Sequence, residues 1–385
     1  MPEKKFLGKT FDELISRPVY YRGIPPLPKP QPMKAKDVTG ANMPLSRDII
    51  KLDDVIKKYK ANGKGFCAAL IDSGVAKHRD INAAISKRVS CNGRKRDIYD
   101  TFGHGTHIAG LIAGRGSNTA GKGVASQAKI LSLKVTDADG GDASWHSIFN
   151  ALNEVISRVD RWTPKDGPMI SVVNLSINSH DNDIKPSHNI HNHKLIKCIE
   201  HLHDMNVPVV VSSGNNFERY HTYGLAYPAY YNKLISVGAV VNFPFEDGYY
   251  MDTIAPFSQR IEPEQKTTSS FILAPGVLSV SLDIAKKDKN GICYGYGYMT
   301  GTSLAAPIVT GIILLMQEIY INTRHSGKKK YKYLPPVTTL QQCLTRGSES
   351  ITNIPHGSRK RSPYYDGREY KRINTVNIIK ELKKI

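Results

Sequence analysis

Three short segments carry, in order along the chain, an acid, a base and a hydroxyl group, each at the edge of an apolar run. Asp72 follows the apolar run 66–71, His104 lies in the sequence G-H-G-T-H, and Ser303 precedes the apolar run 304–316. A serine hydroxyl becomes a good nucleophile only beside a base, and an acid can hold that base in the required tautomer. A lone serine before a helix is more often an N-cap, but the three segments together favour nucleophilic catalysis.

The motifs around these residues are specific. D-S-G, H-G-T-H and G-T-S-x-A-x-P each occur once, and a fourth block, V-V-V-S-S-G-N, ends at Asn215. In these motifs and their order the chain resembles the subtilisin-like serine proteases, with flanking matches from about residue 50 to residue 379. The resemblance implies a serine endopeptidase that hydrolyses peptide bonds through an Asp72–His104–Ser303 triad and an acyl-enzyme intermediate. It also implies that Asn215 donates a hydrogen bond to the oxyanion.

The resemblance further implies a cleft for an extended polypeptide substrate, which adds as a strand at one edge. Two segments resemble the walls of the family's primary pocket. Ala226 matches the residue at the base of that pocket, and a glycine pair resembles the opposite edge of the cleft. These substrate-binding residues are Ser176, Ile177, Asn178, Gly214, Ala226, Gly140 and Gly141. A small base predicts a preference for a medium or large apolar side chain, and Asn178 replaces a glycine that is usual in the wall.

No cofactor is required by this chemistry, and calcium is the metal to consider. Asp80 matches a carboxylate that ligates the family's tight calcium, but the companion loop has Ser117 in place of an asparagine and carries Arg115. A hard cation prefers several oxygen ligands and little positive charge nearby, so we expect weak occupancy at best. His104 and His107 are spaced for one helix face, but a zinc site needs a further ligand. We interpret His107 as structural.

Short apolar runs alternate with amphipathic stretches from about residue 52 onward. Strands are expected at 66–71, 129–135, 169–175, 207–212 and 234–240, and helices near 52–60, 143–159 and 190–205. This alternation predicts an α/β, subtilisin-like fold with a parallel twisted sheet and helices on both faces. In such sheets the site lies at the carboxyl ends of the strands.

The chain divides into three parts. Residues 46–325 are expected to form the peptidase domain, which the basic C-terminal extension 326–385 completes. Residues 1–45 include a proline-rich stretch that favours extended chain. The family resemblance makes this N-terminal extension a candidate pro-segment that lies across the cleft, while a disordered tail is the alternative.

Composition narrows the setting. The 385 residues include 53 basic and 34 acidic ones, for a net charge of +19, with dense runs at 328–332 and 359–361. These runs indicate either a solvated basic face or a surface for an anionic partner, nucleic acid included. Five scattered cysteines and a basic N-terminus without a following apolar stretch predict a reducing, cytoplasmic location. No apolar run of about 18 residues stands out, so no membrane span is expected. A subtilase fold without activity is a rival interpretation.

Overall fold

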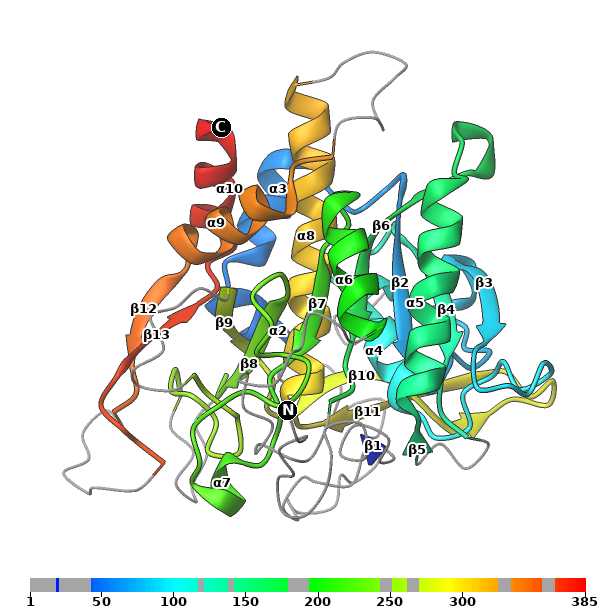
Figure 1. The fold of residues 1–385 in the computed structure, drawn as a ribbon, viewed down its shortest axis with the longest axis horizontal. Coiled ribbons are helices and arrows are strands. Elements are labelled where there is room, and N and C mark those ends of the chain that lie inside the picture. The colour runs from blue at the N-terminus through cyan, green and yellow to red at the C-terminus, as the bar shows by residue number, and fades with distance from the viewer. Residues whose placement is uncertain are drawn as a thin grey trace, which may run out of the picture.

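A nine-stranded sheet forms the centre of the protein (Figure 1). The computed structural model describes residues 19–20, 43–116, 121–137, 142–178, 194–242, 251–261, 270–324, 334–354 and 364–385. The strand order is β12-β13-β9-β8-β7-β6-β2-β4-β3. β12 pairs with β13 in antiparallel fashion, and every other neighbouring pair in this sheet is parallel. The predicted α/β fold with a parallel sheet is therefore confirmed.

The strands of the sheet are short, as expected for an α/β protein. Their bounds are β2 Phe66–Asp72, β3 Ile85–Ser90, β4 Lys129–Lys134, β6 Met169–Leu175, β7 Val209–Ser212, β8 Ile235–Val240, β9 Ser270–Pro275, β12 Glu349–Thr352 and β13 Glu369–Arg372. Two small antiparallel pairs lie outside this sheet: β1 (Val19–Tyr20) with β5 (Asp142–Ala143), and β10 (Ser279–Lys287) with β11 (Cys293–Met299).

Helices cover both faces of the sheet. They are α2 Met43–Ile49, α3 Leu52–Tyr59, α4 His104–Ala113, α5 Trp145–Asp160, α6 Lys194–Asp204, α7 Phe217–Tyr220, α8 Thr302–Arg324, α9 Val337–Gly347 and α10 Thr375–Lys384. All seven residues of β2 are buried because successive side chains enter two different cores. Phe66, Ala68 and Leu70 join the core that includes α3, α4, α8, α9 and α10. The intervening residues join the core under α5 and α6.

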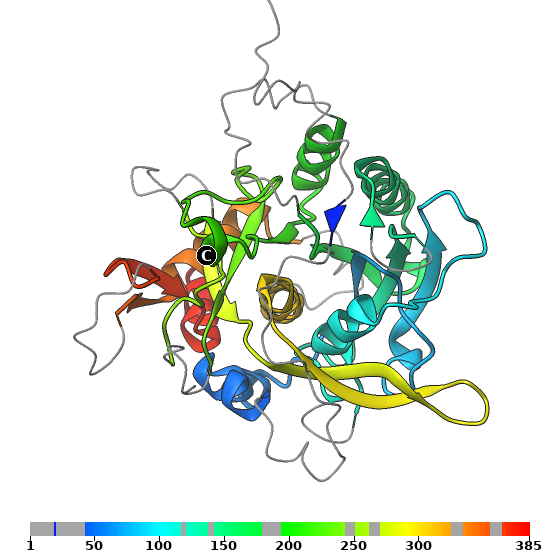
Figure 2. The same cartoon turned by 90° about the horizontal axis from the view of Figure 1, so that it is seen from below.

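α8 is the central helix of one core, and Figure 2 shows it end-on near the middle of the molecule. Among the described residues it is long and apolar enough to span a bilayer by length and composition, contrary to the expectation that no such run occurs. However, 89% of its most apolar window is buried inside the protein. Core helices of this kind carry apolar residues on all sides because protein surrounds them.

The C-terminal residues extend the sheet and cover it. β13 continues the parallel order beside β9, with Arg372 opposite Leu273, and α10 packs against both α9 and α3. The backbone N–H of Thr375 donates to the carbonyl of Ile50, which ties the last helix to the beginning of the domain. Sequence analysis did not predict β12, β13, α9 or α10. The dense basic runs 328–332 and 359–361 lie outside the described residues.

Candidate active site

The carboxyl end of β2 and the first turns of α4 and α8 bring the predicted acid, base and nucleophile together. His104 Nδ1 lies 2.8 Å from Asp72 Oδ1, and His104 Nε2 lies 3.1 Å from Ser303 Oγ. A carboxylate can only accept a hydrogen bond, so Nδ1 carries the proton. In this tautomer Nε2 carries no proton and can accept the Ser303 hydroxyl proton. All three residues are buried.

A second carboxylate, which sequence analysis missed, holds the loop that presents His104. Buried Asp100 accepts hydrogen bonds from the backbone N–H groups of Phe102, Gly103 and Thr106 and from the Thr106 hydroxyl. The Ser73 hydroxyl also donates to Asp100, at 2.9 Å. Because Ser73 directly follows Asp72, this network fixes the acid and the base relative to each other. A carboxyl four residues before the histidine was the available signal.

The nucleophile occupies the second position of α8. Pro307 lies four residues further on and lacks the N–H that would bond to the Ser303 carbonyl in a regular helix. The Ser176 hydroxyl donates to that carbonyl instead, at 2.9 Å. Because of this proline, the Ser303 carbonyl is available to Ser176, which directly follows β6. This bond joins the predicted pocket wall to the backbone of the nucleophile.

Asn215 lies beside the N-terminus of α8. Its Oδ1 accepts from the Thr302 backbone N–H at 2.8 Å and from the Thr302 hydroxyl at 2.9 Å. These two bonds assign Oδ1 to the helix side, and Nδ2 is then the side-chain atom with protons to donate. A Cβ added at Gly301 would lie 3.1 Å from Ser303 Oγ and 3.5 Å from Asn215 Nδ2. Glycine at 301 thus leaves open the space between nucleophile and amide where an oxyanion could develop.

The two histidines of the motif differ in chemistry. Burial lowers the pKa of His104, but the charge of Asp72 and the hydrogen bond to it outweigh burial, so the pKa is raised overall. Burial lowers the pKa of His107 to about 4, although it donates through Nε2 to the Ser279 carbonyl at 2.9 Å. His107 therefore stays neutral in the physiological range and contacts β10, as expected for a structural residue.

Two of the predicted pocket residues, Ser176 and Gly214, contact the first turn of α8. Gly214 N–H donates to the Thr302 hydroxyl at 3.2 Å, and the Ala226 N–H donates to the Ser213 carbonyl at 2.9 Å. Ile177 is buried. The Asn178 amide donates to Ser212 Oγ at 2.8 Å and so links one wall to the other, a contact that the usual glycine could not make. Gly140 and Gly141 lie outside the described residues.

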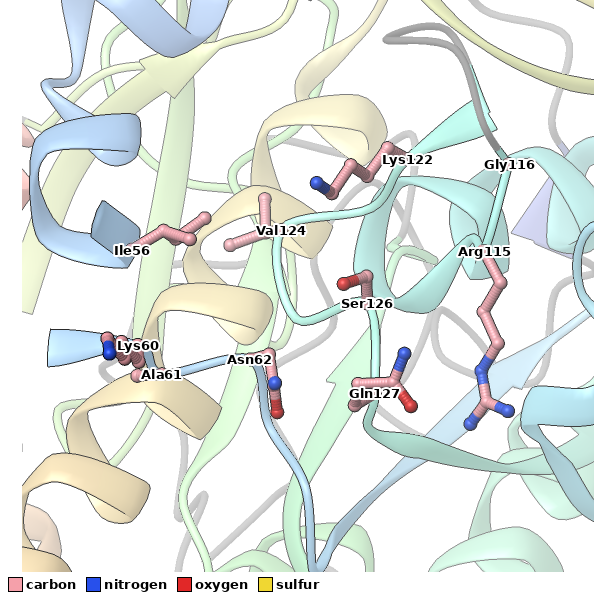
Figure 3. A pocket seen from close by; sticks show the side chains of 10 residues that line it. All are labelled: Ile56, Lys60, Ala61, Asn62, Arg115, Gly116, Lys122, Val124, Ser126 and Gln127. Carbon is pink, nitrogen blue, oxygen red and sulfur yellow. The ribbon is translucent and has the colours of Figure 1, made fainter.

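Among the described residues, the surroundings of Asp80 do not favour a calcium ion. Asp80 Oδ2 accepts a hydrogen bond from the Tyr296 hydroxyl, and Arg79 Nε lies 3.7 Å from Oδ1. Arg115 lies two residues after the end of α4, and its backbone N–H donates to the Asp80 carbonyl at 2.7 Å. With Lys122 it lines a pocket of about 290 Å³ (Figure 3). Within the described ranges there is no cluster of three or more His, Cys, Asp or Glu side chains that could hold a metal ion. Ser117 is outside those ranges. The donor set that is described favours a carboxylate neutralised by protein groups over a hard cation.

The chain belongs to the subtilase family, whose model matches residues 63–347. This membership agrees with the resemblance inferred from the motifs. Subtilases need no organic cofactor.

Three curated relatives illustrate the similarity. Serine protease AprX of Bacillus subtilis (strain 168) is 30% identical over 66% of this chain and 57% of its own length. The major intracellular serine protease of the same organism is 28% identical over 70% of this chain and 76% of its own. Subtilase-type proteinase RRT12 of Saccharomyces cerevisiae (strain ATCC 204508 / S288c) is 27% identical over 84% of this chain and 58% of its own. The chain thus spans little more than half of two of these relatives.

Proposed function

We propose that this subtilase is an active serine endopeptidase with Asp72, His104 and Ser303 as its triad and Asn215 as an oxyanion donor. The observation that carries the proposal is the continuous hydrogen-bonded path from Asp72 through His104 to Ser303. A subtilase fold without activity would not need to keep this path, and every catalytic position is occupied by a competent residue.

The proposed reaction begins when Ser303 Oγ attacks the carbonyl carbon of the scissile bond. His104 Nε2 takes the hydroxyl proton, and Asp72 stabilises the imidazolium. The oxyanion accepts hydrogen bonds from Asn215 Nδ2 and the Ser303 N–H. His104 then gives its proton to the leaving amine as the C–N bond breaks, which leaves an acyl-enzyme. Water, activated by His104, hydrolyses the ester and restores Ser303.

The proposed substrate is an exposed, extended polypeptide. Its backbone would pair with the edge that includes Gly140 and Gly141, and the side chain before the scissile bond would enter a pocket bounded by Ser176, Ile177, Asn178, Gly214 and Ala226. Ala226 is fully buried and small, which supports a medium or large apolar side chain at this position.

The pH dependence of activity tests the triad. Only neutral His104 can accept the Ser303 proton, and its pKa is raised above the ordinary value of about 6.5. We therefore expect kcat/KM for an unfolded polypeptide to rise with pH through a midpoint above about 6.5, with internal cuts identified by mass spectrometry. His107 would not add a second step because its pKa lies far lower. A midpoint below the ordinary histidine value would contradict the assignment.

We also propose that residues 1–45 act as a pro-segment attached to a peptidase domain of residues 46–325 that 326–385 completes. The backbone pairing of β1 with β5 supports this, with Val19 opposite Ala143 and Tyr20 opposite Asp142 (Figure 2). Ala143 also bridges to Thr136, so β1 lies beside the edge proposed for the substrate. A tethered segment at this edge competes with substrate at high effective concentration.

Removal of the extension is therefore expected to increase activity. Protein that starts near Met43 should hydrolyse a folded or unfolded polypeptide faster than the full-length chain, and a peptide covering Val19–Pro32 should inhibit it. A scrambled peptide of the same composition is the control. Equal rates for both forms on a small peptide substrate would show that the extension does not occupy the cleft.

Two further proposals concern the setting. An intracellular, cytoplasmic location is supported by five free, buried cysteines, all among the described residues, and by the relative named as an intracellular protease. Calcium independence is supported by the bond from Tyr296 to Asp80.

For calcium independence we expect a chelator to change the melting temperature little, as measured by thermal unfolding. A fall of about 10 °C or more that added calcium reverses would show that an ion still binds the native state.

A further inference from the structure

The segment 213–226 carries both Asn215 and the proposed pocket residues Gly214 and Ala226, and its position depends on residues 257–260. Gln259 N–H donates to the Gly214 carbonyl at 2.9 Å, and Gly224 N–H donates to the Arg260 carbonyl at 2.9 Å. A Cβ at Gly214, where φ is +107°, would lie 2.9 Å from Gln259 Cγ. We call residues 213–226 the pocket loop.

Arg260 is completely buried under the pocket loop. Its guanidinium carbon lies 3.7 Å from the centre of the Phe217 ring, which belongs to that loop. The same guanidinium donates to the carbonyls of Ala255 at 3.3 Å and Tyr364 at 2.8 Å. A buried charge is costly unless it is paired and hydrogen-bonded, and here the pairing comes from the C-terminal residues.

Asp366 provides that pairing, with its carboxylate 3.9 Å from Arg260 Nη1 and its side chain only 7% exposed. It accepts hydrogen bonds from Tyr370 Oη at 2.6 Å, from Asn353 Nδ2 at 3.0 Å and from Tyr223 Oη at 3.1 Å. Burial raises the pKa of Asp366, but these hydrogen bonds and Arg260 outweigh it and lower the pKa overall, so the group is a carboxylate at neutral pH.

The C-terminal segment contacts the pocket loop at several points. Tyr223 is in the loop: its hydroxyl donates to Asp366, and the Arg368 guanidinium carbon lies 4.7 Å from the centre of its ring. The His221 ring stacks on Tyr364 with centroids 5.4 Å apart. Residues 364–370 therefore contact the pocket loop directly at His221 and Tyr223, a few residues after the proposed oxyanion donor Asn215.

We propose that Arg260 and Asp366 are positioning residues, through which the C-terminal segment 364–370 fixes the pocket loop and thereby sets selectivity for the substrate side chain before the scissile bond. The proposal rests on the pocket assigned above. Neither residue needs to touch the substrate. With the pair broken, the pocket loop that carries Gly214 and Ala226 loses part of its support, while the hydrogen bonds that join Asp72, His104 and Ser303 remain.

A second buried arginine provides a matched control. Arg372 comes from the same C-terminal part, and its side chain is 8% exposed and pairs with Glu349 and, at 2.8 Å, with Asp252. Its side chain also donates to the Ile49 carbonyl. None of these partners belongs to the pocket loop, so loss of this pair is expected to lower stability without changing selectivity.

The experiment compares Asp366→Asn with Glu349→Gln in the full-length chain and in protein starting near Met43. Each variant is assayed well below its own melting temperature, on peptides that differ only in the side chain before the scissile bond. For Asp366→Asn we expect kcat/KM on the preferred peptide to fall roughly tenfold to a hundredfold. The spread of kcat/KM values between the best and the worst peptide should therefore narrow. Labelling by a small fluorophosphonate that does not fill the pocket should change less than about twofold, since the triad is intact and Asn215 is also held by its hydrogen bonds from Thr302.

The outcomes separate this proposal from the proposed function. Unchanged selectivity in Asp366→Asn, or equal narrowing in Glu349→Gln, overturns the positioning role while leaving the peptidase intact. A wild-type protein that neither cleaves nor labels overturns the function itself. If Asp366→Asn does not fold, Tyr223→Phe removes only the hydroxyl contact to Asp366, and it should narrow the same spread to a smaller extent. Full selectivity in Tyr223→Phe would then count against the proposal.

Discussion

Replacing Ser303 with alanine is expected to abolish hydrolysis and fluorophosphonate labelling while the protein stays folded. The substitution removes only the hydroxyl oxygen, and Ser303 is at a buried helix position where alanine is a favourable residue. The bonds from Asn215 to Thr302 and from Ser176 to the Ser303 carbonyl involve no atom that is lost. Any hydrolysis that remains would come from substrate binding and the oxyanion hole alone, and its rate would be far below that of the wild type.

Active-site labelling followed by mass spectrometry of the labelled peptide checks this prediction. The control is Ser176→Ala, which removes a hydroxyl of the same kind 2.9 Å from the Ser303 carbonyl but leaves the nucleophile in place. That variant should still be labelled at Ser303. Persistent labelling of another serine in Ser303→Ala would show that the nucleophile has been assigned to the wrong residue.

Replacing Asn215 with alanine is expected to lower kcat by about 10²–10³-fold, the magnitude that is known for loss of such a donor in subtilisin itself. KM should change little, because the amide acts on charge that develops only in the transition state. Steady-state kinetics on a peptide substrate measure both parameters. A loss that appeared wholly in KM would make Asn215 a substrate contact instead.

Stability must be separated from catalysis at this position, because Asn215 Oδ1 also caps α8 through Thr302. Loss of a cap costs about 1 kcal/mol. Asn215→Asp keeps an acceptor for the Thr302 N–H and lacks the amide donor. We therefore expect it to retain more of the wild-type melting temperature than Asn215→Ala while losing at least as much kcat.

The catalytic residues could be predicted from sequence because each lies at an element boundary within a short motif. Asp72 ends β2 and His104 begins α4, and the strand expected at 169–175 has the bounds of β6. The supporting contacts were harder to foresee. Ser176 and the Ser303 carbonyl are far apart in sequence, and only Pro307 marked a carbonyl that would need a partner. The role of Asp100 depends on a loop whose backbone turns toward it, which no periodicity reveals.

The C-terminal elements escaped prediction for a different reason. β12 and β13 have four residues each, with alternating exposure rather than a continuous apolar run. Such strands at the edge of a sheet carry a weak hydrophobic signal, and their pairing is decided by partners far along the chain. Arg260 shows the limit most clearly, since nothing in its sequence neighbourhood indicates a carboxylate more than a hundred residues away as its partner.

The meeting of Thr375 with Ile50 has a consequence for the order of events during synthesis. α3 lies at the start of the domain and α10 near its end, and α10 packs against α3 as well as α9. Contacts between such distant segments form late, because the intervening chain must first be ordered. We expect a nascent chain that has emerged only through α8 to contain every catalytic side chain and yet hydrolyse nothing. Peptidase activity would then begin only once α10 has also been made and has packed against α3 and α9.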